Sequence, residues 1–162
     1  MTRRDTGQTA FRCGKQFNTT AMKIVKLQGT DRKLYELVAP LVMSPPIVRY
    51  NNNYPFKTGV RYTWYVAVEN DAAVGFMPLR RNSSGECILD NYYVRGDDAD
   101  LLERLLATVI ADGENRAGLQ ATVHKRHVER FARQGFSPCL QWKNYEKMRY
   151  DPHHTHVQAE RI

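Results

Sequence analysis

The sequence lacks most of the features that assign a function directly. It has no apolar run of about eighteen residues, so no transmembrane helix is expected. Its basic N-terminus has no apolar segment of the signal-peptide kind. P-loop, HExxH, GxSxG and zinc-finger patterns are absent, which excludes the common hydrolases and NTPases that carry them. His153, His154 and His156 match no standard zinc spacing, and we expect no metal site.

Cysteine is also scarce, with three residues and no CxxC pair. An odd number of separated cysteines, Cys13, Cys87 and Cys139, argues against a disulfide framework. Reduced thiols are typical of cytoplasmic proteins, and we expect a cytoplasmic location. A catalytic thiol would need a base close in space, for which His124 and His127 are candidates.

Acidic residues are outnumbered by basic ones, 17 against 24, which gives a net charge of +7. This surplus favours a polyanionic partner: a nucleic acid, a coenzyme that carries phosphates, or an acidic surface. The interleaved basic and aromatic residues of nucleic-acid modules are missing, so a nucleic acid is the least favoured partner. The sequence leaves the oligomeric state open, a dimer included.

A length of 162 residues fits one domain with its own core. Residues 1–21 are polar and basic without apolar periodicity, and we interpret them as a disordered arm or a tag-like extension. Regular hydrophobic patterns run through residues 22–150, which we take as the domain, and a flexible tail is expected at 151–162.

Within the domain the hydrophobic pattern changes between the period of strands and the period of helices. A strand at 22–27 precedes a helix that Thr30 or Asp31 caps and that Pro45 and Pro46 end. The pattern then predicts strands at 61–69, 73–79 and 87–94, a helix at 100–112 capped by Gly113, a strand at 119–123, a short helix at 127–134 and extended chain at 140–150.

This order predicts an α/β fold with a mixed (α+β) sheet. Three consecutive strands form an antiparallel meander, and the helix at 100–112 permits a parallel crossover from 87–94 to 119–123. Helices then cover both faces of the sheet. Because the long helix follows a central strand directly, its N-terminus opens at the end of that strand, where backbone N–H groups attract anions.

Four segments in this order resemble the GNAT family of N-acetyltransferases. They are Ala73-Val74-Gly75-Phe76, Asp90-Asn91-Tyr92-Tyr93-Val94, Leu101-Leu102-Glu103-Arg104-Leu105-Leu106 and Phe131-Ala132-Arg133-Gln134-Gly135-Phe136, and Asn144-Tyr145-Glu146-Lys147-Met148 resembles the last strand of the family. The resemblance covers residues 22–150.

The resemblance implies an N-acyltransferase that moves an acetyl or acyl group from acetyl-CoA or another acyl-CoA to an amine. The family binds the coenzyme pyrophosphate at a loop and the following helix N-terminus. On this sequence that implies coenzyme-binding roles for Tyr93, Val94, Arg95, Gly96 and Ala99.

The family mechanism also implies a base for the amine and an acid, often a tyrosine, for the leaving thiolate. We select Tyr145, Asp90 and His124 as the catalytic candidates. Glu69 is a further candidate for the base, and Tyr92 and Tyr93 are further candidates for the acid, although each tyrosine also fits as a packed strand aromatic.

The sequence departs from the family pattern at its loop, where Asp98 and Asp100 replace two glycines. Their carboxylates would repel a pyrophosphate, so we expect weak binding of acetyl-CoA that glycines at both positions would improve. The same aspartates, with Asp97, also fit as helix caps that need no ligand. Phe131 replaces the expected tyrosine and cannot donate a proton. The alternative is therefore a catalytically degenerate GNAT-like binding module.

Overall fold

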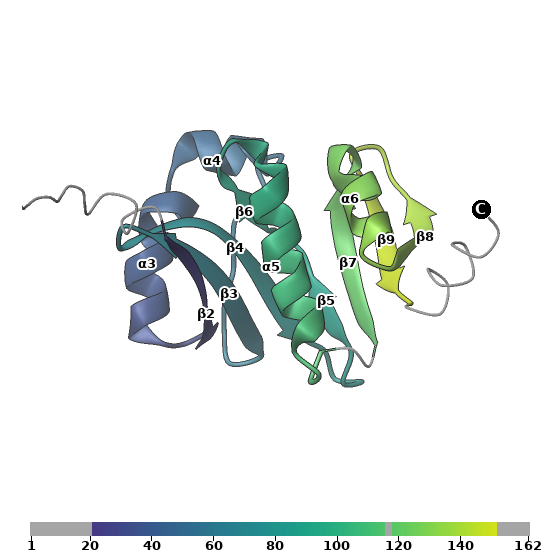
Figure 1. Cartoon of the computed structure of the whole chain (residues 1–162), viewed down its shortest axis with the longest axis horizontal. Coiled ribbons are helices and arrows are strands. Elements are labelled where there is room, and N and C mark those ends of the chain that lie inside the picture. The colour runs from purple at the N-terminus through teal and green to yellow at the C-terminus, as the bar shows by residue number, and fades with distance from the viewer. Residues whose placement is uncertain (1–20, 116–117, 152–162) are drawn as a thin grey trace, which may run out of the picture.

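The computed structural model describes residues 21–115 and 118–151, and Figure 1 shows them as a twisted sheet with helices packed on it. Cys13, most of the expected arm, and the tail with its three histidines lie outside the described residues. The elements are β2 (Met22–Gln28), α3 (Arg32–Val42), α4 (Pro45–Tyr50), β3 (Tyr62–Glu69), β4 (Ala72–Arg81), β5 (Cys87–Leu89), β6 (Tyr93–Val94), the 3-10 turn η1 (Arg95–Asp97), α5 (Ala99–Ala111), β7 (Leu119–His124), the 3-10 turn η2 (Lys125–His127), α6 (Val128–Arg133), β8 (Phe136–Gln141) and β9 (Tyr145–Tyr150).

Within the described residues the strands form one sheet in the order β2-β3-β4-β5-β7-β9-β8. β6 pairs with β4, beyond the point where β5 ends. The pairs are antiparallel except for β5 with β7, the two strands that α5 connects. The predicted fold class, an antiparallel meander with one parallel crossover, is confirmed.

The meander begins with a tight hairpin between β3 and β4. Asn70 and Asp71 form its two-residue turn, and their φ angles of 53° and 64° are both left-handed. Two consecutive residues with positive φ match the right-handed twist of the strands, and Asn and Asp tolerate that conformation well. The turn predicted at these residues is confirmed.

Side chains of β3 alternate between two cores on opposite faces of the sheet. Tyr65 and Ala67 belong to the core beneath α5, whereas Trp64 and Val66 belong to the core beneath α3. The apolar face predicted for α5 is confirmed. Leu102, Leu105, Leu106 and Val109 are each 1% exposed or less. Burying each of these side chains contributes roughly 1.5–3 kcal/mol.

Gly75 lets β4, β6 and α5 approach one another closely. A Cβ at this position would lie 2.9 Å from the Tyr93 carbonyl oxygen and 3.2 Å from Leu101 Cδ2. A larger residue would push β6 and the first turn of α5 away from β4. The glycine thus helps to hold the N-terminus of α5 next to the centre of the sheet.

One local prediction is wrong, and two others are incomplete. α5 ends at Ala111 with Asp112 as its cap, not Gly113, because contacts to the sheet hold Asp112 in extended conformation. Pro45 and Pro46 follow the end of α3 but also begin α4, since proline at the first helical positions sacrifices no hydrogen bond. The extended chain at 140–150 is a hairpin, whose strand β8 begins at Phe136 and accommodates Pro138 because it lies at the edge of the sheet.

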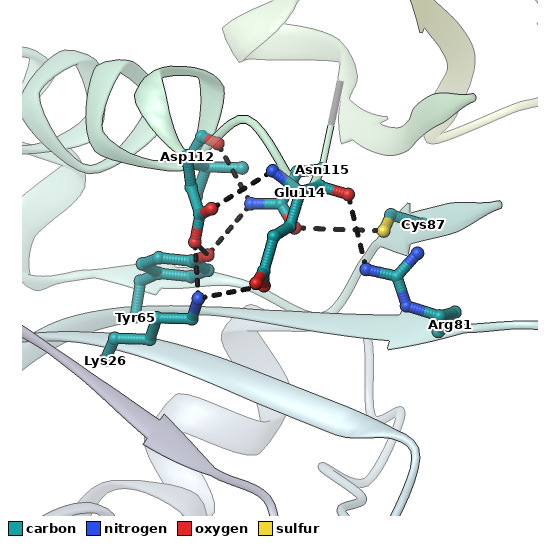
Figure 2. A network of polar contacts seen from close by, with 8 residues as sticks. Lys26, Tyr65, Arg81, Cys87, Asp112, Glu114 and Asn115 are labelled. Atoms are coloured by element: carbon teal, nitrogen blue, oxygen red, sulfur yellow. Dashed lines mark hydrogen bonds and ion pairs between the residues drawn. The ribbon is translucent and has the colours of Figure 1, made fainter. Parts of the chain in front are cut away.

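A polar network fixes the C-terminal end of α5 to the sheet (Figure 2). The Asp112 carboxylate accepts hydrogen bonds from Lys26 Nζ and Tyr65 Oη, both at 2.6 Å. Asn115, only 4% exposed, donates to Tyr65 Oη at 2.8 Å. The Cys87 thiol donates to Asn115 Oδ1, and burial raises the pKa of that thiol, so Cys87 is a structural residue and not a partner of either histidine.

We expect Asp112→Asn to destabilise the fold by about 1 kcal/mol, because the variant loses an ion pair that is only partly shielded from solvent. The hydrogen bonds from Lys26 and Tyr65 lower the pKa of Asp112 to about 2. Its stabilising effect is complete above the ordinary Asp pKa and is lost as pH falls toward 2. Urea unfolding of both proteins between about pH 7 and pH 3 should show their difference shrinking. A difference that is constant with pH would contradict this role.

Candidate functional site

The sheet opens between two neighbouring strands. β5 and β7 pair only through Cys87–Leu89 and Leu119–Ala121. Beyond that point Tyr93–Val94 pair with β4 alone, and the end of β7 pairs with β9 alone. Two parallel strands that separate leave a wedge between them, and α5 begins beside this wedge (Figure 1). Most of the residues selected from the sequence lie near it, whereas Glu69 and the Arg95 side chain lie in a separate hollow.

The turn before α5 brings the five expected coenzyme-binding residues to the helix N-terminus. Tyr93 and Val94 form β6, Arg95 and Gly96 are the first two residues of η1, and Ala99 is the first residue of α5. Gly96 has φ of 63°, a left-handed conformation that suits glycine. Arg95 turns away from the wedge, since its guanidinium pairs with Glu69 at 3.0 Å.

The three aspartates of this turn have different surroundings. Asp98 Oδ1 accepts a hydrogen bond from Leu101 N at 3.1 Å, so Asp98 caps α5 as expected. Asp100 lies on the side of the turn that faces Arg95 and Arg104, in a shallow hollow outside the wedge. Asp97 alone turns toward η2, with the left-handed φ of 55° that this direction requires.

The Asp97 carboxylate occupies an anion-binding position. It accepts hydrogen bonds from Arg126 Nε at 2.9 Å, from His127 Nε2 at 2.8 Å and from the Tyr50 hydroxyl. Around these contacts is a groove of about 190 Å³, lined by Asp97, Ala99, Leu102, Arg126, His127 and Arg130. The chain thus supplies its own anion at the mouth of the wedge, next to the positive end of the α5 dipole.

Tyr92 fills the inner part of the wedge. Its ring is 1% exposed, and its hydroxyl accepts a hydrogen bond from the His124 backbone N–H at 3.1 Å. The same hydroxyl lies 2.7 Å from His127 Nδ1, to which it donates, so that His127 Nε2 carries the proton given to Asp97. Burial raises the pKa of Tyr92 and lowers that of His127, which keeps both groups neutral.

His124 ends β7, and its ring contacts His127, which lines this groove. Its ring is 2% exposed and packs 4.9 Å from the Tyr145 ring and 5.7 Å from the His127 ring, measured between centroids. Its Nδ1 has no hydrogen-bond partner among the described residues. Burial, helped by the charge of Arg126, lowers the pKa of His124 to about 4, so the ring is neutral near pH 7.

A larger cavity lies on the other face, below the end of β7. Ala121 and Val123 belong to the core beneath α5, so the alternation of β7 turns Thr122 to the opposite side. The cavity has a volume of about 520 Å³ and is lined by Tyr54, Asp90, Asn91, Thr122, Trp142, Lys143, Asn144 and Tyr145. It brings together Asp90 and Tyr145, and the Tyr145 ring packs against His124.

The three catalytic candidates therefore lie together, whereas Glu69, the other carboxylate considered, lines the hollow near Arg95 and not this cavity. Tyr145 Oη accepts a hydrogen bond from Asn52 Nδ2 at 2.8 Å. Sequence reasoning missed the contacts of Asp97 and the aromatic residues Tyr54 and Trp142. In the sequence, Asp97 is marked only by its place next to Gly96, and Tyr54 and Trp142 are marked only as aromatic residues in polar segments.

Within residues 21–115 and 118–151, no group of three His, Cys, Asp or Glu side chains is placed to hold a metal ion. No helix in these residues is long and apolar enough to cross a membrane.

No protein-family model matches the chain, and no curated protein sequence matches it significantly. Solved structures do match. ElaA from Escherichia coli (TM-score 0.62, 12% identity) and an acyl-CoA N-acyltransferase from Pseudomonas aeruginosa (0.63, 13%) each align over 81% of this chain and 100% of their own. The PaiA N-acetyltransferase from Thermoplasma acidophilum, solved in complex with coenzyme A, aligns over 82% of this chain and 99% of its own (0.55, 16%). The chain has the GNAT fold, as the sequence resemblance implied.

The ring of His124 should titrate near pH 4, well below the ordinary histidine pKa, because the buried ring loses hydration when it is charged. NMR detection of its ring carbon during an acid titration measures this value directly, and His124→Gln assigns the signal. A titration midpoint near 6.5 would show that the ring is hydrated and would remove it from the wall between groove and cavity.

Proposed function

We propose that this chain is an N-acyltransferase that moves an acyl group from an acyl-CoA, with acetyl-CoA as the simplest donor, to an amine. The observation that supports it most strongly is the position of His124, whose ring packs against His127 of the cationic groove and against Tyr145 of the cavity. A donor that enters from the groove and an acceptor held in the cavity would meet at a neutral imidazole.

The groove offers the charges that a pyrophosphate needs. Arg126 contacts the groove directly, and Arg130, which now pairs with Glu103 at 2.8 Å, lies on its wall. The N-terminus of the thirteen-residue helix α5 adds backbone N–H groups and a positive dipole end. The neighbour from T. acidophilum binds coenzyme A on the same fold, which agrees with this assignment.

Asp97 must give up its place before a coenzyme can bind there. Its carboxylate takes the hydrogen bonds of Arg126 and His127 that a phosphate would use. The displaced contacts are partly exposed, so their loss costs a few kcal/mol at most, in the range of about 1 kcal/mol for each hydrogen bond. The several phosphate charges of the coenzyme offset the loss of these contacts, and we expect weak binding as the net result.

The chemistry then needs one proton acceptor and one donor. The amine nitrogen attacks the thioester carbonyl, the C–N bond forms, and the C–S bond breaks to release the coenzyme thiolate. Attack makes the nitrogen strongly acidic, so a base as weak as His124 suffices to take its proton. Tyr145, beside His124, is the candidate for the acid that protonates the thiolate.

A second candidate function is a GNAT-fold binding module without catalysis. The observation in its favour is that Tyr92 and Asp97 together close the wedge with side chains of the chain itself. Under this function the cavity on the other face would bind its ligand with no coenzyme present.

Coenzyme affinity tests the role of Asp97. We expect Asp97→Asn to bind coenzyme A about tenfold more tightly than wild type, because it removes the competing charge and keeps a side chain that accepts the left-handed φ. Calorimetric titration at one salt concentration measures the change. Asp98→Asn is the matched control, since it removes the same charge and preserves the helix cap. Equal improvement in both variants would mean that only net charge matters.

Turnover tests the role of His124. With acetyl-CoA and a mixture of primary amines, release of the free coenzyme thiol should be measurable for Asp97→Asn. Adding His124→Gln should lower kcat by about a hundredfold without changing coenzyme affinity, because the base is lost and the groove is intact. Thiol release that His124→Gln leaves unchanged would remove His124 as the base. A coenzyme-bound protein that releases no thiol with any amine would favour the binding module.

A further inference from the structure

The cavity beside β9 is lined by three aromatic side chains and by several polar ones. Tyr54 lies in the segment after α4, Trp142 lies in the turn between β8 and β9, and Tyr145 begins β9. Tyr54 and Trp142 are 58% and 46% exposed, and because both line this one cavity they give it apolar surface that a ligand could cover. The Tyr54 and Tyr145 rings meet edge-on, 6.4 Å apart. A volume of about 520 Å³ suits a small organic molecule.

Asp90 supplies the carboxylate of this cavity and has no partner for it. The residue follows β5 directly, where the strand leaves β7, and is partly buried. Within the described part of the chain no ion pair or hydrogen bond reaches its carboxylate, whereas the carboxylates of Asp97 and Asp112 each accept several. Burial raises the pKa of Asp90, against the opposing charges of Arg80 and Lys57. A bound cation would replace the hydration that the carboxylate has lost.

The other charges near the cavity restrict what that cation can be. Lys143 lines the exposed rim, and Lys57 and Arg80 act on Asp90 from farther away. Their repulsion disfavours a bare metal ion, which would gain only the single carboxylate. An ammonium ion on an apolar group gains more, because it adds contacts with the three rings, including cation–π attraction to Trp142. The ammonium also has three N–H donors for Asp90 and the amide oxygens of Asn91 and Asn144.

We infer that this cavity is a binding site for a small organic ammonium ion with an aromatic or similar apolar group, with Asp90 as its counter-charge. Under the proposed acyl transfer this ligand is the acceptor, which releases one proton to solvent before the free amine attacks the thioester. Because the site needs no coenzyme, the inference holds equally for the binding module, and a failure of acyl transfer leaves it intact.

Three probes of the same size and different charge test the inference on the coenzyme-free chain. They are 2-phenylethylamine, the neutral 2-phenylethanol and the anionic 3-phenylpropionate, each titrated while the Trp142 indole N–H is followed by NMR. We expect the amine to bind at least about tenfold more tightly than the alcohol, and the anion to bind least. Equal binding of amine and alcohol would overturn the role of Asp90, and preference for the anion would assign the ligand charge to Lys143 instead.

Two variants test whether the Asp90 carboxylate is the charge that binds the amine. Asp90→Asn keeps the shape of the side chain and should weaken the amine about tenfold while leaving the alcohol unchanged. Asp71→Asn is the matched control, since it removes the same charge in the exposed β3–β4 turn and should change neither probe. If both variants weaken the amine equally, the effect belongs to the net charge of the chain and the inference fails. The alcohol serves as the check on folding, because its affinity depends on an intact cavity.

Discussion

The organisation of this molecule depends on how briefly β5 and β7 pair. Their ladder lasts from Cys87 to Leu89, after which β6 stays with β4 and β7 stays with β9. If the parallel ladder continued, backbone hydrogen bonds would occupy the space that Tyr92 now fills. The continuous sheet would then separate the groove on one face from the cavity on the other. The separation also frees the chain after Val94 to turn and start α5 at the wedge. Gly75 on one side of α5 and the Asp112 network at its far end hold the helix in that position.

The electrostatics of the wedge follow from one carboxylate. Arg126 and the start of α5 create a site for an anion, and an empty site of this kind would bring a cationic side chain and a helix end together without compensation. Asp97 provides the missing charge from within the chain. This internal anion occupies the position that an external anion would take, so under the proposed function coenzyme binding would require η1 to move. The cavity on the other face presents the reverse case, because no side chain of the described residues pairs with the Asp90 carboxylate.

Much of the fold could be predicted from the sequence, because strong local signals agree there. The turn at Asn70–Asp71, the apolar face of α5 and the parallel crossover are all as expected, and the three catalytic candidates do lie together. The roles of the aspartates could not be predicted. Asp97, Asp98 and Asp100 have the same side chain within one turn, and the left-handed φ angles of Gly96 and Asp97 decide which of them faces Arg126.

The same limit applies to the tyrosines. Tyr92 and Tyr93 are neighbours and point in different directions. Which of them faces the wedge depends on the residue at which β6 begins, and for a strand of two residues the hydrophobic pattern does not define that point. Tyr54 and Trp142 reach the cavity from loops, where no periodicity indicates a direction. The signal that identifies them is exposure of large aromatics, and exposure is a property of the folded chain.

A crystal structure of the Asp97→Asn chain with bound coenzyme A tests the central claim most directly. The account predicts the pyrophosphate at the N-terminus of α5, in contact with Arg126, with residue 97 turned out of the groove and Tyr92 moved from the wedge. A coenzyme bound elsewhere on the surface, with residue 97 still held by Arg126 and His127, would contradict it.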